Sequence, residues 1–160
     1  MSQTKVHVNP DDTTVNIPLD TTIVIDEDVW IGQKVFIGSD VVIQGNYTTI
    51  GESAEIDDGV KIGAGAELGK GIKIGKNVRI GAMVVVGTEA DIGSGALIGD
   101  HVVIGNNVSI GEAVIIGSGV LIGDGTVVSP RVRIPSYWQI DANKFINPGN
   151  KATGFLPQIH

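Results

Sequence analysis

The sequence predicts an all-β fold, a parallel β-helix that is triangular in cross-section. Two observations predict it. An aliphatic residue (Ile, Leu or Val) recurs every six residues at sixteen successive positions from Ile50 to Ile140. The residues between these positions repeat a short apolar–polar alternation followed by a turn rich in Gly and Asn. Three such steps make one coil of eighteen residues, and coils stack at about 4.8 Å, the spacing of neighbouring strands.

The repeating unit is represented by Val102 to Asn107. Alternation along a strand puts Val102 and Ile104 on the inner face and Val103 on the outer face. The next pair, Asn106-Asn107, is typical of a turn, and Gly or Asn often fills its second position because these residues accept positive φ readily. A strand this short is not stable alone, so the unit requires stacked neighbours.

The ends of the repeat set the expected boundaries. Six-residue steps begin at Leu19, pass one extra residue between Ile43 and Ile50, and continue to Ile140, which predicts a β-helix of about seven coils over residues 19–140. A solenoid exposes open strand edges at its ends. Residues 1–18 are therefore expected to form an N-terminal cap of two short strands, and residues 141–160 an irregular C-terminal cap, with Trp138 closing the narrow interior.

Composition excludes several classes of function. The chain has 160 residues, enough for one domain, and a net charge of −7, which disfavours a nucleic-acid partner. It has no cysteine, which excludes disulfides, thiolate metal sites and a Cys nucleophile. No signal peptide and no apolar run long enough to span a membrane are visible, so a cytoplasmic protein without membrane contact is expected.

These residues resemble the hexapeptide-repeat proteins with a left-handed parallel β-helix, typified by trimeric acyltransferases, over roughly Leu19 to Ile140. Ile134-Pro135-Ser136-Tyr137 also looks like the step that closes the helix in small-molecule acetyltransferases of this family, although Pro148 to Ala152 departs from the stretch that usually follows. The resemblance implies the left-handed winding, which periodicity does not supply. It also implies a homotrimer and, for an enzyme, an acyl-CoA co-substrate.

One edge of the prism is predicted to be an interface. Every eighteenth outward residue lies on one face, and two adjacent faces turn apolar over the same coils: Val85, Val103 and Leu121 beside Leu97 and Ile115. A contiguous apolar patch usually marks an interface, and closed cyclic symmetry is the ordinary way to bury it. The sequence thus favours a homotrimer. The alternative is scattered surface aliphatics on a β-rich face.

Only three histidines are available for catalysis: His7, His101 and His160. In the lipid-precursor branch of the resembling family, a His general base lies two residues after the core aliphatic residue. Here His101 lies three residues after Ile98, in the slot where positive φ is expected and where His is tolerated. His101 is thus a candidate general base or an ordinary turn residue, while His7 and His160 lie in the expected caps.

Lys61 and Arg79 are stacked cations that could hold the phosphates of coenzyme A between subunits, or could pair with Glu67 across the trimer edge. No metal site is predicted. A segment near Tyr47 resembles a step of the γ-class carbonic anhydrases, but the three His ligands for zinc have no counterparts.

Two functions remain open from the sequence. The first is a trimeric scaffold or assembly protein that needs no cofactor, favoured because family enzymes of other branches carry their His on loops extruded from the coils, and this repeat has none. The second is an acyl-CoA-dependent O- or N-acyltransferase with His101 as general base. Whether His101 faces a cleft within reach of Lys61 or Arg79 distinguishes the two.

Overall fold

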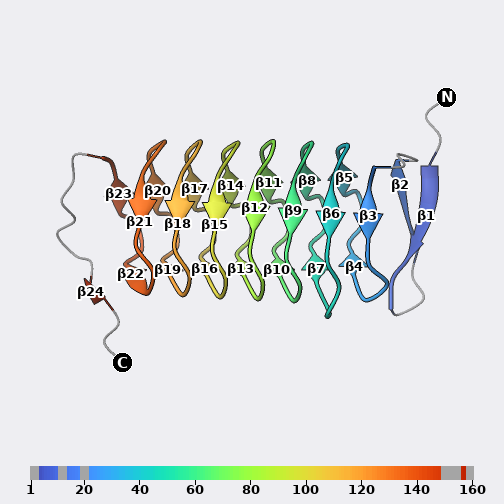
Figure 1. Cartoon of the computed structure of the whole chain (residues 1–160), viewed down its shortest axis with the longest axis horizontal. Coiled ribbons are helices and arrows are strands. Elements are labelled where there is room, and N and C mark those ends of the chain that lie inside the picture. Colours follow the sequence, from blue (N-terminus) through green and yellow to red (C-terminus); the bar gives the residue numbers. More distant parts are fainter. Residues whose placement is uncertain (1–3, 11–13, 19–21, 149–155, 158–160) are drawn as a thin grey trace.

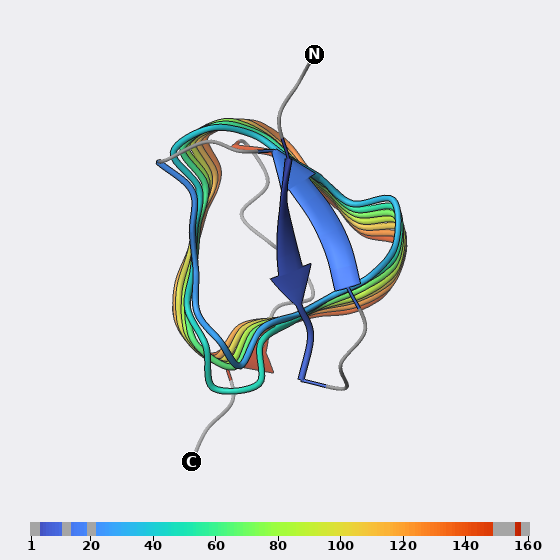
Figure 2. The same ribbon diagram turned by 90° about the vertical axis from the view of Figure 1, so that its right-hand side faces the viewer.

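The computed structural model describes residues 4–10, 14–18, 22–148 and 156–157. It confirms the predicted left-handed parallel β-helix of about seven coils, in which three sheets form the faces of a prism (Figures 1 and 2). Leu19, the predicted first residue of the repeat, lies outside the described residues. The part of the chain described here contains no helix long and apolar enough to cross a membrane.

Each face is one sheet whose parallel strands are eighteen residues apart, with one nineteen-residue step where the extra residue intervenes. Sheet I contains β3 (Val24–Ile25), β6 (Val42–Ile43), β9 (Lys61–Ile62), β12 (Arg79–Ile80), β15 (Leu97–Ile98), β18 (Ile115–Ile116) and β21 (Arg133–Ile134). Sheet II contains β4 (Trp30–Ile31), β7 (Thr49–Ile50), β10 (Glu67–Leu68), β13 (Val85–Val86), β16 (Val103–Ile104), β19 (Leu121–Ile122), β22 (Trp138–Ile140) and the antiparallel β24 (Leu156–Pro157). Sheet III contains β5 (Phe36–Ile37), β8 (Glu55–Ile56), β11 (Lys73–Ile74), β14 (Asp91–Ile92), β17 (Ser109–Ile110), β20 (Val127–Val128) and β23 (Phe145–Ile146).

The interior of the prism is a continuous column of aliphatic side chains. From β4 to β21 the second residue of each strand points inward and is buried, as Ile104 is, and the residue before the strand often supplies a smaller buried partner such as Val102 or Ala66. Burying each Ile contributes roughly 1.5–3 kcal/mol relative to exposure. The alternation predicted from the sequence is therefore what separates core from surface at every step.

Glycine after the inner aliphatic residue permits the coils to stack closely. A Cβ built on Gly63 would lie 2.6 Å from the carbonyl carbon of Gly81 and 2.7 Å from the backbone nitrogen of Ala82 in the next coil. The turn position two residues further on has a different requirement, positive φ, which both Gly95 (71°) and Asn107 (54°) adopt. The two glycine-rich positions of the repeat thus serve distinct steric purposes.

The N-terminal end of the prism carries an antiparallel hairpin. Strands β1 (Thr4–Val8) and β2 (Thr14–Pro18) pair with each other and lie across the opening of the first coil (Figure 2). The buried Asn9 amide donates to the Ile31 carbonyl oxygen (3.0 Å) and accepts from the Ile31 N–H (2.7 Å). Asn9 therefore pairs with the open edge of sheet II as a further strand would, which blunts that edge.

The repeat extends one step beyond the boundary predicted at residue 140. Strand β23 pairs in parallel with β20, and Ile146 occupies a buried inner position. This additional strand is not evident from the sequence because the composition becomes irregular after Ile140. Trp138 is half-buried and packs against the end of the core, in the inner slot expected for it.

The one extra residue is accommodated in the turn between β6 and β7. Asn46 and Tyr47 both adopt positive φ, 62° and 63°, so the turn protrudes beyond the stacked corners (teal in Figure 2). The buried Thr48 hydroxyl donates to the Gly45 carbonyl oxygen and accepts from the Gly65 N–H, both at 2.9 Å. Thr48 thus fixes the irregular turn to the next coil.

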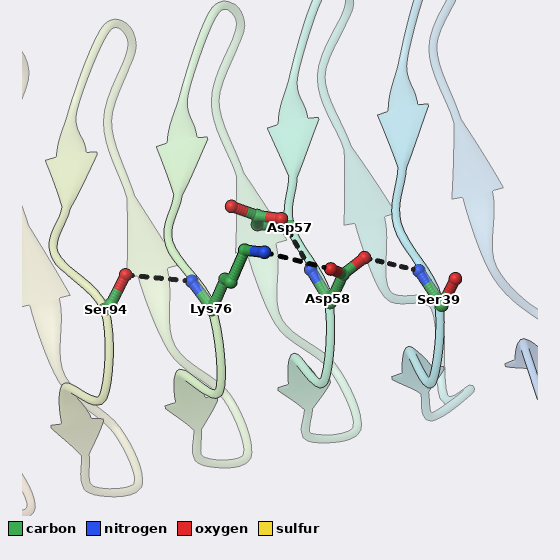
Figure 3. Close-up of polar contacts among 5 residues, drawn as sticks. All are labelled: Ser39, Asp57, Asp58, Lys76 and Ser94. Carbon is green, nitrogen blue, oxygen red and sulfur yellow. Dashed lines mark hydrogen bonds and ion pairs between the residues drawn. The ribbon is translucent and has the colours of Figure 1, made fainter.

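Polar side chains connect successive turns along the corner between sheets III and I (Figure 3). The Asp58 carboxylate accepts from the Ser39 N–H (2.9 Å) and lies 3.3 Å from the Lys76 ammonium, while the Ser94 hydroxyl accepts from the Lys76 N–H (3.1 Å). These contacts satisfy exposed turn amides, and each is worth little because solvent competes for it.

Candidate functional site

Five apolar side chains project outward beside one corner of the prism, and we call them the apolar edge. Val85 aligns with Val103, and Val103 with Leu121, along sheet II, while Leu97 aligns with Ile115 along sheet I. Sheets I and II meet at the corner formed by residues 81–84, 99–102 and 117–120, so the two rows flank it. The structure therefore brings together the residues that the sequence grouped.

The apolar edge is open to solvent in the single chain. Val85, Leu97 and Val103 are 37–40% exposed, whereas Ile115 and Leu121 are half-buried between their neighbours. The exposed Met83 side chain lies in the same corner and adds to the surface. Sequence analysis missed Met83 because it occupies a turn position, although its unusual identity in a slot of Gly and Asn is a recognisable signal.

His101 lies in the same corner, between the two rows of the apolar edge. Its φ of 58° is that of the turn slot, and its backbone N–H donates to the Ala82 carbonyl oxygen (2.9 Å). The side chain is exposed, and its imidazole makes no hydrogen bond or ion pair with the residues described. The backbone conformation is thus the one expected of an ordinary turn residue.

Asp100, the carboxylate next to His101, is engaged by the backbone. Its Oδ1 accepts from the Ala82 N–H at 2.8 Å, and its own N–H donates to the Ser118 hydroxyl at 3.2 Å. Asp100 belongs to a chain of side-chain contacts along this corner like the one in Figure 3. In this arrangement its hydrogen bonds stabilise the corner rather than orient an imidazole.

Lys61 and Arg79 lie side by side in neighbouring strands of sheet I, beside a shallow groove. The two are aligned partners of β9 and β12, and within the described chain neither forms an ion pair. The groove, about 330 Å³, is lined by Val42, Gln44, Lys61, Ile62, Gly63, Arg79, Ile80, Gly81, Ala82 and Asp100. His101 itself does not line it, although its neighbour Asp100 does.

His7, the other histidine in the described part of the chain, makes a contact within the N-terminal end of the prism. His7 Nε2 donates to the Val29 carbonyl oxygen (2.7 Å), so this ring joins the N-terminal hairpin to the first coil. His160 lies outside the described residues. Over the described ranges there is no group of three His, Cys, Asp or Glu side chains arranged to hold a metal ion.

Comparison with known proteins connects this geometry to a repeat family. The profile described as "Bacterial transferase hexapeptide (six repeats)" matches residues 53–88 and 71–105. No curated protein matches the sequence.

Two solved structures share the fold. A mutant of GDP-perosamine N-acetyltransferase from Caulobacter crescentus, in complex with CoA and GDP-perosamine, is 19% identical with a TM-score of 0.54. The alignment covers 82% of this chain and 56% of that one. LpxA, a UDP-N-acetylglucosamine acyltransferase from Bacteroides fragilis, is 21% identical with a TM-score of 0.55, over 82% of this chain and 60% of that one. The chain thus spans less than two thirds of either protein, and at these identities the likeness concerns the fold.

Proposed function

We propose that this chain, a left-handed parallel β-helix whose residues 53–105 match a hexapeptide-repeat profile, is a homotrimeric scaffold assembled through its apolar edge. The observation that carries this proposal is the aligned apolar surface on both sides of one corner. Exposed apolar surface of this continuity is costly in a free monomer and is characteristic of an interface.

The outward residues of sheets I and II are complementary level by level. In a ring of subunits with parallel axes, sheet I of one subunit meets sheet II of the next at the same height. Leu97 and Ile115 then face the row of Val85, Val103 and Leu121. Toward the N-terminal end, Lys61 faces Glu67 in the same way, and Arg79 lies at the level of Val85. This match of apolar with apolar and of opposite charges supports closed head-to-tail symmetry.

The regularity of the coils supports a scaffold rather than an enzyme. Between residues 22 and 148 the described chain departs from six-residue steps only at the turn near Tyr47 and extrudes no longer loop. His101, the one candidate base in this range beside the apolar edge, has the backbone conformation of a turn residue. A rigid prism with its ends displayed is suited to holding partners at a fixed separation.

Native mass spectrometry and sedimentation equilibrium at micromolar concentration test the scaffold proposal. We expect a mass three times that of the 16.6 kDa chain. A monomer across the accessible concentration range would refute the trimer.

An acyl-CoA-dependent acyltransferase is the second candidate, supported by one arrangement. The groove beside Lys61 and Arg79 reaches Asp100, and His101 is the next residue in the same corner. In a trimer, this groove would lie along the cleft between subunits. Lys61 and Arg79 would then hold the phosphates of acyl-CoA, while His101 would remove the proton of an acceptor hydroxyl or amine.

Calorimetric titration with coenzyme A and acetyl-CoA separates the two functions. The scaffold proposal predicts no saturable heat for the wild type. Micromolar binding that is abolished in an Arg79→Ala variant, together with acyl transfer that is lost in His101→Ala, would replace the scaffold with the enzyme. Because His101→Ala leaves the cationic groove intact, a folded variant should still bind coenzyme A while it loses acyl transfer. Loss of coenzyme A binding in this variant would instead indicate misfolding.

A further inference from the structure

Two aromatic side chains on the first coils, Trp30 and Tyr47, line one groove nearer the N-terminal end than the apolar edge. Tyr47 is 75% exposed, in a chain where aromatic residues make up only 4%. Trp30, at the start of sheet II, lines the same groove as Tyr47. This groove of about 300 Å³ is lined by Pro10, Asp28, Trp30, Tyr47, Thr48 and Thr49.

The position of Tyr47 is fixed by an unfavourable backbone conformation. Both Asn46 and Tyr47 have positive φ. Asn adopts this region readily, whereas for an aromatic residue such as Tyr47 it is uncommon and costs about 1–2 kcal/mol. The Thr48 hydroxyl holds this turn from below through its two hydrogen bonds. Positive φ also occurs at other turns of the prism, such as that of His101, so it marks a turn. At Tyr47 this turn presents a ring at the surface, in the groove that Trp30 also lines.

The charge around the groove selects the kind of ligand. The turn between β3 and β4, in the same corner as the groove, has three successive exposed acidic residues, Asp26, Glu27 and Asp28. Asp28 lines the groove and is exposed, and no described residue forms an ion pair with it. Neighbouring Asp26 accepts from the Gly45 N–H at 2.8 Å, which ties the acidic segment to the base of the same turn.

We propose that the groove of Trp30, Tyr47 and Asp28 binds a small quaternary ammonium ligand of the choline type. Aromatic ring faces attract a cation through their quadrupoles, and such recognition is strongest where the ammonium carries apolar methyl groups. The carboxylate of Asp28 supplies the opposite charge. A neutral sugar would use the same rings but would gain nothing from the acidic surroundings.

The groove lies in the same corner as the apolar edge but nearer the N-terminal end, with the row of Glu67 between it and Val85 on sheet II, so in the proposed trimer it would border the neighbouring subunit. Ligand-observed NMR titration with choline tests the proposal on the intact protein. The matched comparison is 3,3-dimethylbutan-1-ol, which has the same shape without the charge. We expect saturable binding of choline. The affinity for the neutral isostere should be at least about tenfold lower.

Variants locate the site and separate its two components. Tyr47→Leu and Asp28→Asn should each weaken choline binding about fivefold or more. Tyr137→Leu is the matched control, because Tyr137 occupies the same turn slot at the other end of this corner, with a φ of 65° and 57% exposure. That variant should bind as the wild type does.

Four results would overturn the proposal: no saturable binding of choline, equal binding of choline and its isostere, preferential binding of methyl glucoside, or equal loss in the Tyr47 and Tyr137 variants. Asp28→Asn keeps both rings and the strained turn. It therefore provides a test even where Tyr47→Leu alters folding, which thermal unfolding of each variant would reveal.

Discussion

At the level of single residues, the turn slot determines what His101 can be. A φ of 58° is uncommon for any residue with a Cβ, and it is least accessible to β-branched side chains. We expect His101→Gly to change the free energy of unfolding by less than about 1 kcal/mol, and His101→Val to lower it by about 1–2 kcal/mol. Chemical denaturation of the three proteins checks this. Equal stability of the Val and Gly variants would contradict the turn assignment.

The two glycine positions of the repeat predict different sensitivities. Gly63→Ala places a methyl group against the backbone of Gly81 and Ala82, which cannot move without separating the coils, so a loss of about 1–3 kcal/mol is expected. Gly95 has nothing within 4 Å of its Cβ position but has a φ of 71°. Gly95→Ala should therefore cost about 1 kcal/mol, from backbone strain alone. Thermal denaturation distinguishes them, and a smaller loss for Gly63→Ala would refute the stacking explanation.

Sequence reasoning reached some residues and missed others for identifiable reasons. Inner positions such as Ile104 were predictable because alternation around a six-residue step leaves one arrangement. The turn conformation of His101 followed from its distance to Ile98. The groove of Trp30 and Tyr47 was missed because it joins residues from different coils around an irregular turn, and no period describes it.

At the level of the elements, the turn between β6 and β7 depends on one buried hydroxyl. Thr48→Val keeps the shape of the inner slot, where Val84 and Val102 stand in later coils, but removes two hydrogen bonds. We expect a loss of about 1 kcal/mol. The Gly65 N–H then keeps only its longer bond to the Gly45 carbonyl oxygen (3.1 Å), so faster amide exchange at Gly65 should accompany the loss, measurable by hydrogen–deuterium exchange NMR.

Thr126→Val is the matched control for this turn. Thr126 is also buried in an inner slot, but its hydroxyl donates to Asp141 near the C-terminal end. The Thr126→Val substitution should leave the rate of amide hydrogen exchange at Gly65 unchanged. Acceleration at Gly65 in both variants would show that the effect spreads along the whole prism.

The strands of the prism could be predicted from the sequence more completely than its two ends. The strands from β7 to β22 follow the predicted six-residue spacing because each is specified by its own six residues. Strand β23 was assigned to an irregular tail, since Phe145 and Pro148 interrupted the composition although Ile146 kept the spacing. The edge contacts of Asn9 could not be predicted, because an amide pairing with a strand 22 residues away has no local signature.

At the level of the whole molecule, the trimer that we propose depends on one edge of the prism. Val103→Lys together with Ile115→Lys would bury charges in the proposed interface, so we expect monomers by sedimentation velocity and an unchanged β-helix by circular dichroism. Val127→Lys is the matched control, because Val127 is 38% exposed but lies on sheet III, away from the apolar edge. Dissociation caused equally by Val127→Lys would show that the interface lies elsewhere.

The eighteen-residue spacing between stacked strands has a consequence for the size of the rod. Insertion or removal of one whole coil keeps every strand on its face of the prism, whereas a single extra residue has to be absorbed in a turn, as it is between β6 and β7. Each whole coil therefore changes the distance between the two ends by about 4.8 Å. The number of coils therefore sets the length of the β-helix.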